Sequence, residues 1–224
     1  GESDRLYGMA SVPLQSPEVA ADELRRCANN LGLRGVEIGT TVNGVPLDDK
    51  QFTPFFAAAE ELGMPIMVHP CYSGKPPQFQ DFYMKNLIGN PLATAVAASR
   101  MILSGFLDRH PNLDVILVHA GGFMPYQIGR LDHGYKVRSE SRENIDKLPS
   151  EYLRRFHYDT ITHAAAPLKF LVDLAGHDRV VFGTDLPFDM GDRSFDSIIA
   201  AADLPAESAS AIEKDNAERL FKLD

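Results

Sequence analysis

Apolar runs and amphipathic segments alternate along most of this chain. Runs rich in valine, isoleucine and other apolar residues predict six β-strands, at residues 9–14, 34–39, 64–69, 114–118, 156–161 and 179–185. The segments after them carry apolar residues at helical spacing and predict helices that begin at Ser16, Asp48 or Asp49, Asn90, about Pro125, Pro167 and Pro205. A strand followed by a helix, six times over, predicts parallel strands joined by helical crossovers.

Local signals mark the ends of these elements. Ser16 is the expected N-cap of the first helix and Pro17 its first residue, and Gly32 is expected to end it. The loop at residues 70–89 is rich in proline, glycine and aromatic residues, so it is a candidate wall or lid of an active site. The charged segment at residues 138–149 predicts a surface loop.

Two α/β architectures fit this pattern, an open doubly wound sheet and a (β/α)₈ barrel. A complete barrel takes about 250 residues. Six strand–helix units already fill the 224 residues here, so a full barrel would need two more strands. No internal repeat or low-complexity linker divides the chain, and we therefore expect residues 1–224 to form a single domain.

Composition narrows the partners that the chain could have. The net charge of −9 and a pI near 5.2 argue against nucleic acid or another polyanion. No apolar stretch reaches the roughly 18 residues of a membrane span, and the N-terminus lacks a secretory signal pattern. The chain has only two cysteines, Cys27 and Cys71, which favours a reduced cytoplasmic protein.

Three predicted strands deliver a chemically competent residue to their C-terminal ends. Residues 64–68 lead to His69, residues 114–118 to His119 and residues 180–184 to Asp185. The carboxyl ends of parallel strands are where α/β folds carry their chemistry. Imidazole nitrogens and carboxylate oxygens on rigid elements suit a divalent metal. The alternatives are buried structural histidines and a turn aspartate in the Gly183–Pro187 stretch.

His119 has two possible functional roles. It could be a third metal ligand, or it could be a general acid or base, because an imidazole titrates near neutral pH. Gly121 and Gly122 follow it and allow a close approach of another group, although they could also be turn glycines.

Other polar residues are weaker candidates. Asp159 could accept a hydrogen bond from a histidine, and Arg130 could hold a substrate carboxylate or be an ordinary surface arginine. Cys71, two residues after His69, could be a metal ligand, but we expect a buried packing thiol. The remaining histidines are expected at the surface: His110, His133, His157, His163 and His177. His157 and His163 lie near the two ends of the fifth predicted strand, so either could instead point into the mouth of the sheet. Dinucleotide, nucleotide and serine-hydrolase motifs are absent from the sequence.

Six short motifs carry a resemblance to a known family. They are Val68-His-Pro70, Val118-His-Ala-Gly-Gly122, Gly129-Arg-Leu-Asp132, Pro149-Ser-Glu-Tyr152, Tyr158-Asp159 and Phe182-Gly-Thr-Asp-Leu-Pro-Phe188. In this order they resemble the amidohydrolase-related family of metal-dependent enzymes that includes 2-amino-3-carboxymuconate-6-semialdehyde decarboxylase and the aromatic-acid decarboxylases. The resemblance runs from about Leu6 to Phe221 and implies an α/β fold of the (β/α)₈ TIM-barrel type.

The resemblance also implies a function. It implies a metal-dependent decarboxylase, a carbon–carbon lyase, that acts on a small carboxylated substrate derived from an aromatic compound. His69 and Asp185 match metal ligands, for Zn²⁺ or another divalent ion, and His119 matches the catalytic histidine. Asp185 also matches the residue that transfers a proton. Arg130 matches an arginine that holds a substrate carboxylate in the neighbouring subunit, which implies a homodimer.

One family feature is missing. The family begins with a His-x-His pair on its first strand, and this sequence has no His-x-His. We therefore expect an N-terminally truncated barrel with six of eight strand–helix units and an incomplete set of metal ligands. Two alternatives to the decarboxylase remain: a metal-dependent hydrolase of a lactone or amide on the same scaffold, and an inactive truncated barrel.

Overall fold

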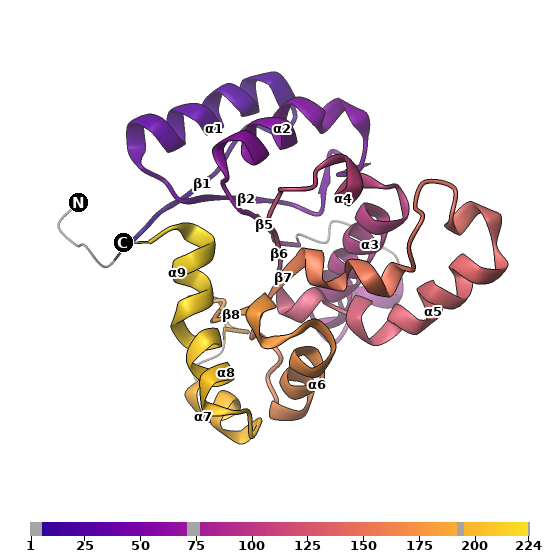
Figure 1. Ribbon diagram of the computed structural model, residues 1–224, viewed down its shortest axis with the longest axis vertical. Coiled ribbons are helices and arrows are strands. Elements are labelled where there is room, and N and C mark those ends of the chain that lie inside the picture. Colours follow the sequence, from indigo (N-terminus) through magenta and orange to yellow (C-terminus); the bar gives the residue numbers. More distant parts are fainter. Residues whose placement is uncertain (1–5, 71–76, 192–194, 224) are drawn as a thin grey trace.

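In the computed structural model, residues 6–70, 77–191 and 195–223 are described. They contain a six-stranded parallel sheet in the order β1-β2-β5-β6-β7-β8 (Figure 1). Its strands are β1 (Met9–Ala10), β2 (Gly35–Ile38), β5 (Ile66–Val68), β6 (Val115–Leu117), β7 (Phe156–Asp159) and β8 (Val180–Val181). A separate antiparallel hairpin joins β3 (Thr41–Val42) to β4 (Val45–Pro46).

Helices connect successive strands of the sheet. The longer ones are α1 (Pro17–Leu31), α2 (Thr53–Leu62), α3 (Asn90–Leu103), α5 (Met124–Val137) and α6 (Ala165–Ala175). Shorter ones are α4 (Phe106–Arg109), α7 (Phe195–Ala201), α8 (Ala206–Ser210) and α9 (Asn216–Phe221). None of the described helices is long and apolar enough to cross a bilayer. The cytoplasmic location stays a prediction.

The parallel α/β fold predicted from the sequence is confirmed. The strands follow one another across the sheet in chain order, as they do in a (β/α)₈ barrel. Among the described residues β1 and β8 are the outermost strands and do not pair with each other, so the barrel is open. The prediction of six visible units, two short of a closed barrel, agrees with this arrangement.

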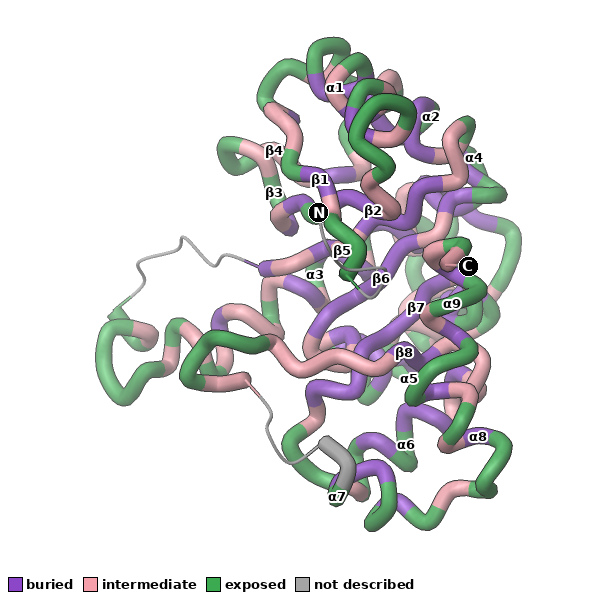
Figure 2. Tube along the Cα trace, turned by 90° about the vertical axis from the view of Figure 1, so that its left-hand side faces the viewer, coloured by how far each residue is buried: buried purple, intermediate pink, exposed green. Residues whose placement is uncertain are grey.

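The sheet forms the centre of the hydrophobic core. Every residue of β6 and β7 is buried, as expected for parallel strands with helices packed against them (Figure 2). Phe56 lies edge-on to Phe55 and to Phe106, with ring centroids 5.2 and 4.7 Å away, and links α2 to α4. These rings belong to the same core cluster as the strand residues Ile66, Val115 and Phe156.

The predicted helix ends are mostly confirmed. Gly32 and Gly63 follow α1 and α2 with φ angles of 66° and 58°, the left-handed conformation that glycine adopts at low cost. Asp49 accepts a hydrogen bond from the backbone N–H of Gln51 and begins the turn before α2. The Ser16 prediction is wrong in its detail, because its side chain makes no cap hydrogen bond to α1.

Several elements differ from the sequence prediction. The hairpin β3–β4 turns at Asn43 and Gly44, both with positive φ, and was not predicted. The strand expected to reach Asp185 ends at Val181, because Phe182 donates its N–H to the Ile212 carbonyl and not to a neighbouring strand. The last predicted helix is divided into α8, a wider turn at Ala211–Asp215, and α9.

Two histidines expected at the surface are buried, so those predictions are wrong. His110 Nδ1 lies 3.3 Å from Glu60 Oε2, and the ring of His110 packs beside Phe106. His157 Nε2 lies 3.3 Å from Asp114 Oδ1 at the amino end of the sheet. Each histidine has a polar partner far away in the sequence, which explains how an imidazole can be buried there.

Candidate functional site

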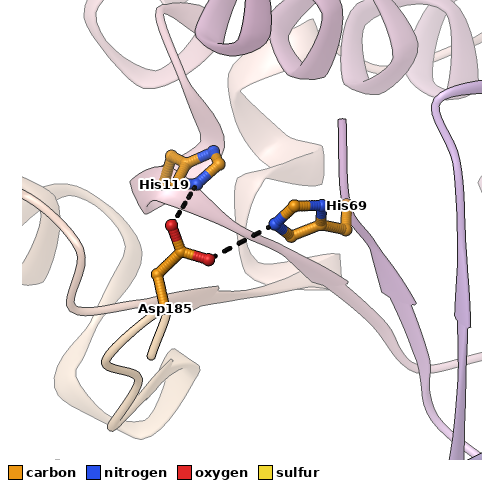
Figure 3. A group of neighbouring side chains, drawn as sticks. All are labelled: His69, His119 and Asp185. Atoms are coloured by element: carbon orange, nitrogen blue, oxygen red, sulfur yellow. Dashed lines mark ion pairs between the residues drawn. The ribbon is translucent and has the colours of Figure 1, made fainter. Parts of the chain in front are cut away.

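The three strand-end residues converge at the carboxyl edge of the sheet. His69 follows β5, His119 follows β6, and Asp185 lies four residues beyond β8. The Asp185 carboxylate stands between the two imidazoles (Figure 3). Its Oδ1 is 3.5 Å from His69 Nε2, and its Oδ2 is 3.7 Å from His119 Nε2. The two rings meet nearly edge-on, with centroids 5.5 Å apart.

This arrangement fits a divalent metal. One donor atom from each of His69, His119 and Asp185 lies within 4.8 Å of the other two. Two nitrogens and one oxygen form the donor set that zinc and similar ions accept, with bonds of about 2.0–2.2 Å. All three side chains are partly exposed, so an ion and a substrate can reach them. The geometry alone permits His119 to be a ligand or a neighbour of the metal.

Backbone contacts place His69. Its N–H donates to the carbonyl of Ile38, 2.9 Å away, which extends the β2–β5 ladder by one residue. The ring of Phe188 stacks on the His69 imidazole, with 6.4 Å between centroids and 26° between planes. The imidazole is therefore held between the end of the sheet and an aromatic ring at the mouth of the site.

An unusual backbone turn places His119. His119 and Ala120 have φ angles of 55° and 53°, the left-handed region that residues with a Cβ rarely adopt. Asp159, at the end of β7, accepts hydrogen bonds from both of their N–H groups. The hypothesis that Asp159 accepts from a histidine is thus met through the backbone and not through the ring.

The segment that carries Asp185 is tied to β7. The Thr160 hydroxyl donates to the carbonyl of Gly183 (3.1 Å) and accepts from its N–H (3.2 Å). Asp185 itself is left-handed, with φ of 54°. Strained backbone of this kind concentrates at functional sites, where surrounding contacts hold it.

Burial changes the pKa values of His119 and Asp159. Burial lowers the pKa of His119, and the charges of Asp159 and Asp185 oppose that effect. Burial also raises the pKa of Asp159, although three backbone N–H groups stabilise its charged form.

A cavity of about 660 Å³ opens above the three residues. Its wall includes Tyr83, Asn86, Leu87, Phe123, His163 and Phe188. Part of the loop predicted as an active-site wall does line it, namely Tyr83, Asn86 and Leu87. His163, expected at the surface, is exposed and stands in this wall at a φ of 56°.

Two sequence candidates lie elsewhere. Arg130 is exposed on α5 and does not line the cavity. Cys71 lies outside the described residues. Phe188 was missed as a site residue, although its place three residues after Asp185 could have indicated it.

Comparison with known proteins gives a consistent picture. The family model described as amidohydrolase matches residues 1–223. The chain is 39% identical to a 2-amino-3-carboxymuconate-6-semialdehyde decarboxylase from Dictyostelium discoideum, over 84% of this chain and 53% of that protein. It is 36% identical to a gamma-resorcylate decarboxylase from Rhizobium sp. (strain MTP-10005), over 99% of this chain and 71% of that protein.

A solved structure agrees with these relatives. The 5-carboxyvanillate decarboxylase from Novosphingobium aromaticivorans, complexed with manganese and 4-hydroxy-3-methoxy-5-nitrobenzoic acid, superposes with a TM-score of 0.89 at 29% identity. The match covers 98% of this chain and 65% of that one. The chain thus spans between 53% and 71% of the length of these proteins.

Proposed function

The chain belongs to the amidohydrolase family, and from this premise we propose that it provides the active site of a metal-dependent decarboxylase. The proposed substrate is a small aromatic or aromatic-derived carboxylate, the class that the relatives' names describe. The alternative hydrolase on the same scaffold receives no support from the compared proteins reported above, which are all decarboxylases.

One observation carries the proposal. The two oxygens of Asp185 face different partners, Oδ1 toward His69 and Oδ2 toward His119. One carboxylate can therefore bind a metal through Oδ1 and exchange a proton through Oδ2. We assign metal binding to His69 and Asp185, and proton transfer to His119 together with Asp185.

The proposed chemistry uses these residues as follows. A bound divalent metal would act as a Lewis acid on substrate oxygens. Burial lowers the pKa of His119, which favours the neutral imidazole. Its Nε2 can then take up a proton from solvent water in the cavity and pass it to Asp185 Oδ2. Asp185 then protonates the substrate carbon that bears the carboxylate. The carbon–carbon bond breaks, its electron pair returns to the substrate, and CO₂ leaves.

Support for the metal comes from the donor set and from the manganese in the related structure. Zinc is the proposed ion, because the imidazole of His69 and the carboxylate of Asp185 are both ligands that zinc takes in proteins. The sequence contributes no His-x-His pair, so fewer protein ligands are available than in the family pattern.

The role assignment predicts different effects of two alanine variants. His119→Ala should lower kcat for gamma-resorcylate about 10³-fold, the range of a lost general acid or base, while Mn²⁺ or Zn²⁺ stays bound. His69→Ala should lose the metal as well as turnover. Loss of the substrate's ultraviolet absorbance measures kcat, and elemental analysis measures metal content.

His133→Ala, on the exposed face of α5, is the control and should keep both values. Loss of metal from a folded His119→Ala protein would make His119 a ligand and contradict its assigned role. A wild-type protein that binds metal and leaves gamma-resorcylate, 5-carboxyvanillate and 2-amino-3-carboxymuconate-6-semialdehyde unchanged would contradict the proposed reaction.

We also propose a homodimer. The proposed substrate carries a negative charge, and an arginine from a second copy would hold its carboxylate. An apolar groove between α3 and α5, lined by residues such as Val96, Phe123, Met124 and Gln127, offers a surface for a second copy. Arg130 lies one helical turn after Gln127, so it projects from the same side of α5 toward that copy.

Arg130→Ala tests this arrangement. We expect a rise in KM for gamma-resorcylate of about 10- to 100-fold, because a charge-assisted contact to the carboxylate is worth about 1.5–3 kcal/mol. Val96→Asp, in the groove, should produce monomers by light scattering and the same rise in KM. An unchanged kcat/KM for Arg130→Ala would contradict the carboxylate clamp, and a monomeric wild type would contradict the dimer.

A further inference from the structure

Asp159 accepts three backbone hydrogen bonds beside the site. It is 7% exposed and lies at the end of β7. Its Oδ2 accepts the His119 N–H at 2.9 Å, and its Oδ1 accepts the Ala120 N–H at 2.7 Å and the Ile161 N–H at 3.1 Å. One carboxylate thereby joins the backbone after β6 to the backbone after β7.

The contacts of Asp159 fall on the strained part of the backbone. His119 and Ala120 are consecutive left-handed residues, and neither is glycine. Such a pair is unfavourable by itself and persists only where its surroundings determine it. Asp159 accepts one hydrogen bond from the N–H of each of these two residues, and these bonds hold the turn in its left-handed form.

The imidazole of His119 lacks the usual means of orientation. In most sites a second hydrogen bond, at the ring nitrogen that does not react, fixes the ring and its tautomer. His119 Nδ1 is buried and has no hydrogen-bond partner among the described residues, while Nε2 faces Asp185. The direction of the ring therefore depends on the backbone that carries it.

We propose that Asp159 is the positioning residue of this site, which sets the left-handed turn at His119 and Ala120 and so aims the His119 imidazole at Asp185. The inference rests on the proposed proton-transfer role of His119. Asp159 does not line the cavity, so it acts through His119 and not on the substrate. Asp159 also packs against Gly183, two residues before Asp185. A Cβ added at Gly183 would lie 3.0 Å from the Cβ of Asp159.

Asp159→Asn is the first test, because it keeps the shape and replaces one acceptor oxygen by an NH₂ donor. With gamma-resorcylate as the probe, kcat should fall about 100-fold, the cost of a reacting group misplaced by about 1 Å. KM and the Kd for Mn²⁺ should each stay within about threefold, because the substituted side chain touches neither the cavity nor His69. Asp114→Asn is the matched control, since it removes the carboxylate that pairs with a β7 residue at the other end of the sheet.

A double-variant cycle separates positioning from general stabilisation. Glycine adopts a positive φ without strain, so Ala120→Gly should reduce the dependence of the turn on Asp159. The kcat loss caused by Asp159→Asn should be about fivefold smaller in the Ala120→Gly background than in the wild type. An equal loss in both backgrounds, or a kcat for Asp159→Asn within twofold of wild type, would overturn the proposal. If Asp159→Asn fails to fold by itself, a double variant that folds and turns over supports the proposal, and one that also fails to fold overturns it.

A measurement without turnover keeps this test separate from the proposed function. In the metal-free wild type, the amide protons of His119 and Ala120 should resist hydrogen exchange by NMR, and Asp159→Asn should accelerate exchange at least tenfold at both. The His119 ring resonances should broaden or shift in the same variant, and the His69 resonances should not. A wild type without decarboxylase activity would remove the proposed function, while unchanged exchange at His119 and Ala120 would remove the positioning role.

Discussion

At the scale of single residues, the site depends on backbone conformations that few side chains accept. The turn that follows β6 contains His119, Ala120, Gly121 and Gly122, all with positive φ. Gly122 has φ of 62° and ψ of −128°, a combination that is essentially restricted to glycine. A Cβ at this position would also overlap the carbonyl oxygen of Pro91, at the start of α3. Gly122 therefore lets the turn pass close to α3 above the candidate site.

Gly122→Ala should consequently destabilise the protein. Backbone strain of about 1–3 kcal/mol and a steric overlap of similar cost together predict a loss of roughly 3 kcal/mol or more in the free energy of unfolding. Urea denaturation measures this loss. Gly129→Ala is the matched control, because Gly129 is exposed within α5, has no atom close to its missing Cβ, and should gain up to about 1 kcal/mol. A Gly122→Ala protein as stable as wild type would show that the turn can relax.

At the scale of elements, residues that favour helix ends and strand ends predicted where several helices and strands stop. Glycines that follow α1 and α2 end those helices as expected, and His69 and His119 do end buried strands. The meeting of three strand ends followed from parallel topology alone, since the carboxyl ends of all strands lie at one edge. The hairpin at Asn43 and Gly44 carried a recognised turn signal and was overlooked.

Other features depended on contacts between distant segments, which a sequence pattern does not contain. His110 and His157 can be buried because the carboxylates of Glu60 and Asp114, far away in the sequence, accept hydrogen bonds from them. The sequence predicted Asp159 as a hydrogen-bond acceptor, but its partners are the backbone N–H groups of His119 and Ala120. No sequence motif predicted the left-handed turn that these two residues form. The position of Arg130 outside the cavity likewise follows from the direction of α5.

At the scale of the whole molecule, the two edges of the sheet carry different groups of ionisable residues. The carboxyl edge carries His69, His119 and Asp185, while the amino edge carries the buried His157 with its partly exposed partner Asp114. The packing between α2 and α4 contains a second buried histidine, His110, with its partly exposed partner Glu60. Stability therefore depends on ionisable groups that lie away from the chemistry, and pH should affect stability and activity through different residues.

His110 makes stability depend on pH in a defined direction. Burial lowers the pKa of His110 below the ordinary value of 6.5, so the unfolded chain binds the proton first. The free energy of unfolding should be unaffected by His110 above pH 6.5 and should fall as the pH drops below it, by about 1.4 kcal/mol for each pH unit until the folded form also protonates. Urea midpoints at pH 8 and pH 5.5 measure this difference.

His110→Gln keeps a polar group opposite Glu60 and removes the titration, so its midpoint should fall less between the two pH values than that of the wild type. His133→Gln, at an exposed histidine, is the control and should follow the wild type. Equal pH dependence in wild type and His110→Gln would assign the acid sensitivity to other groups.

The lengths of the outermost strands have a consequence for self-association. Within the described residues, β1 and β8 have two residues each, whereas the four strands between them have three or four. An outer strand offers its unpaired N–H and C=O groups as a template on which another chain can add a strand, and a short one offers few. Edge-to-edge aggregation of this chain should therefore begin less readily than for a sheet that ends in a strand as long as β2 or β7.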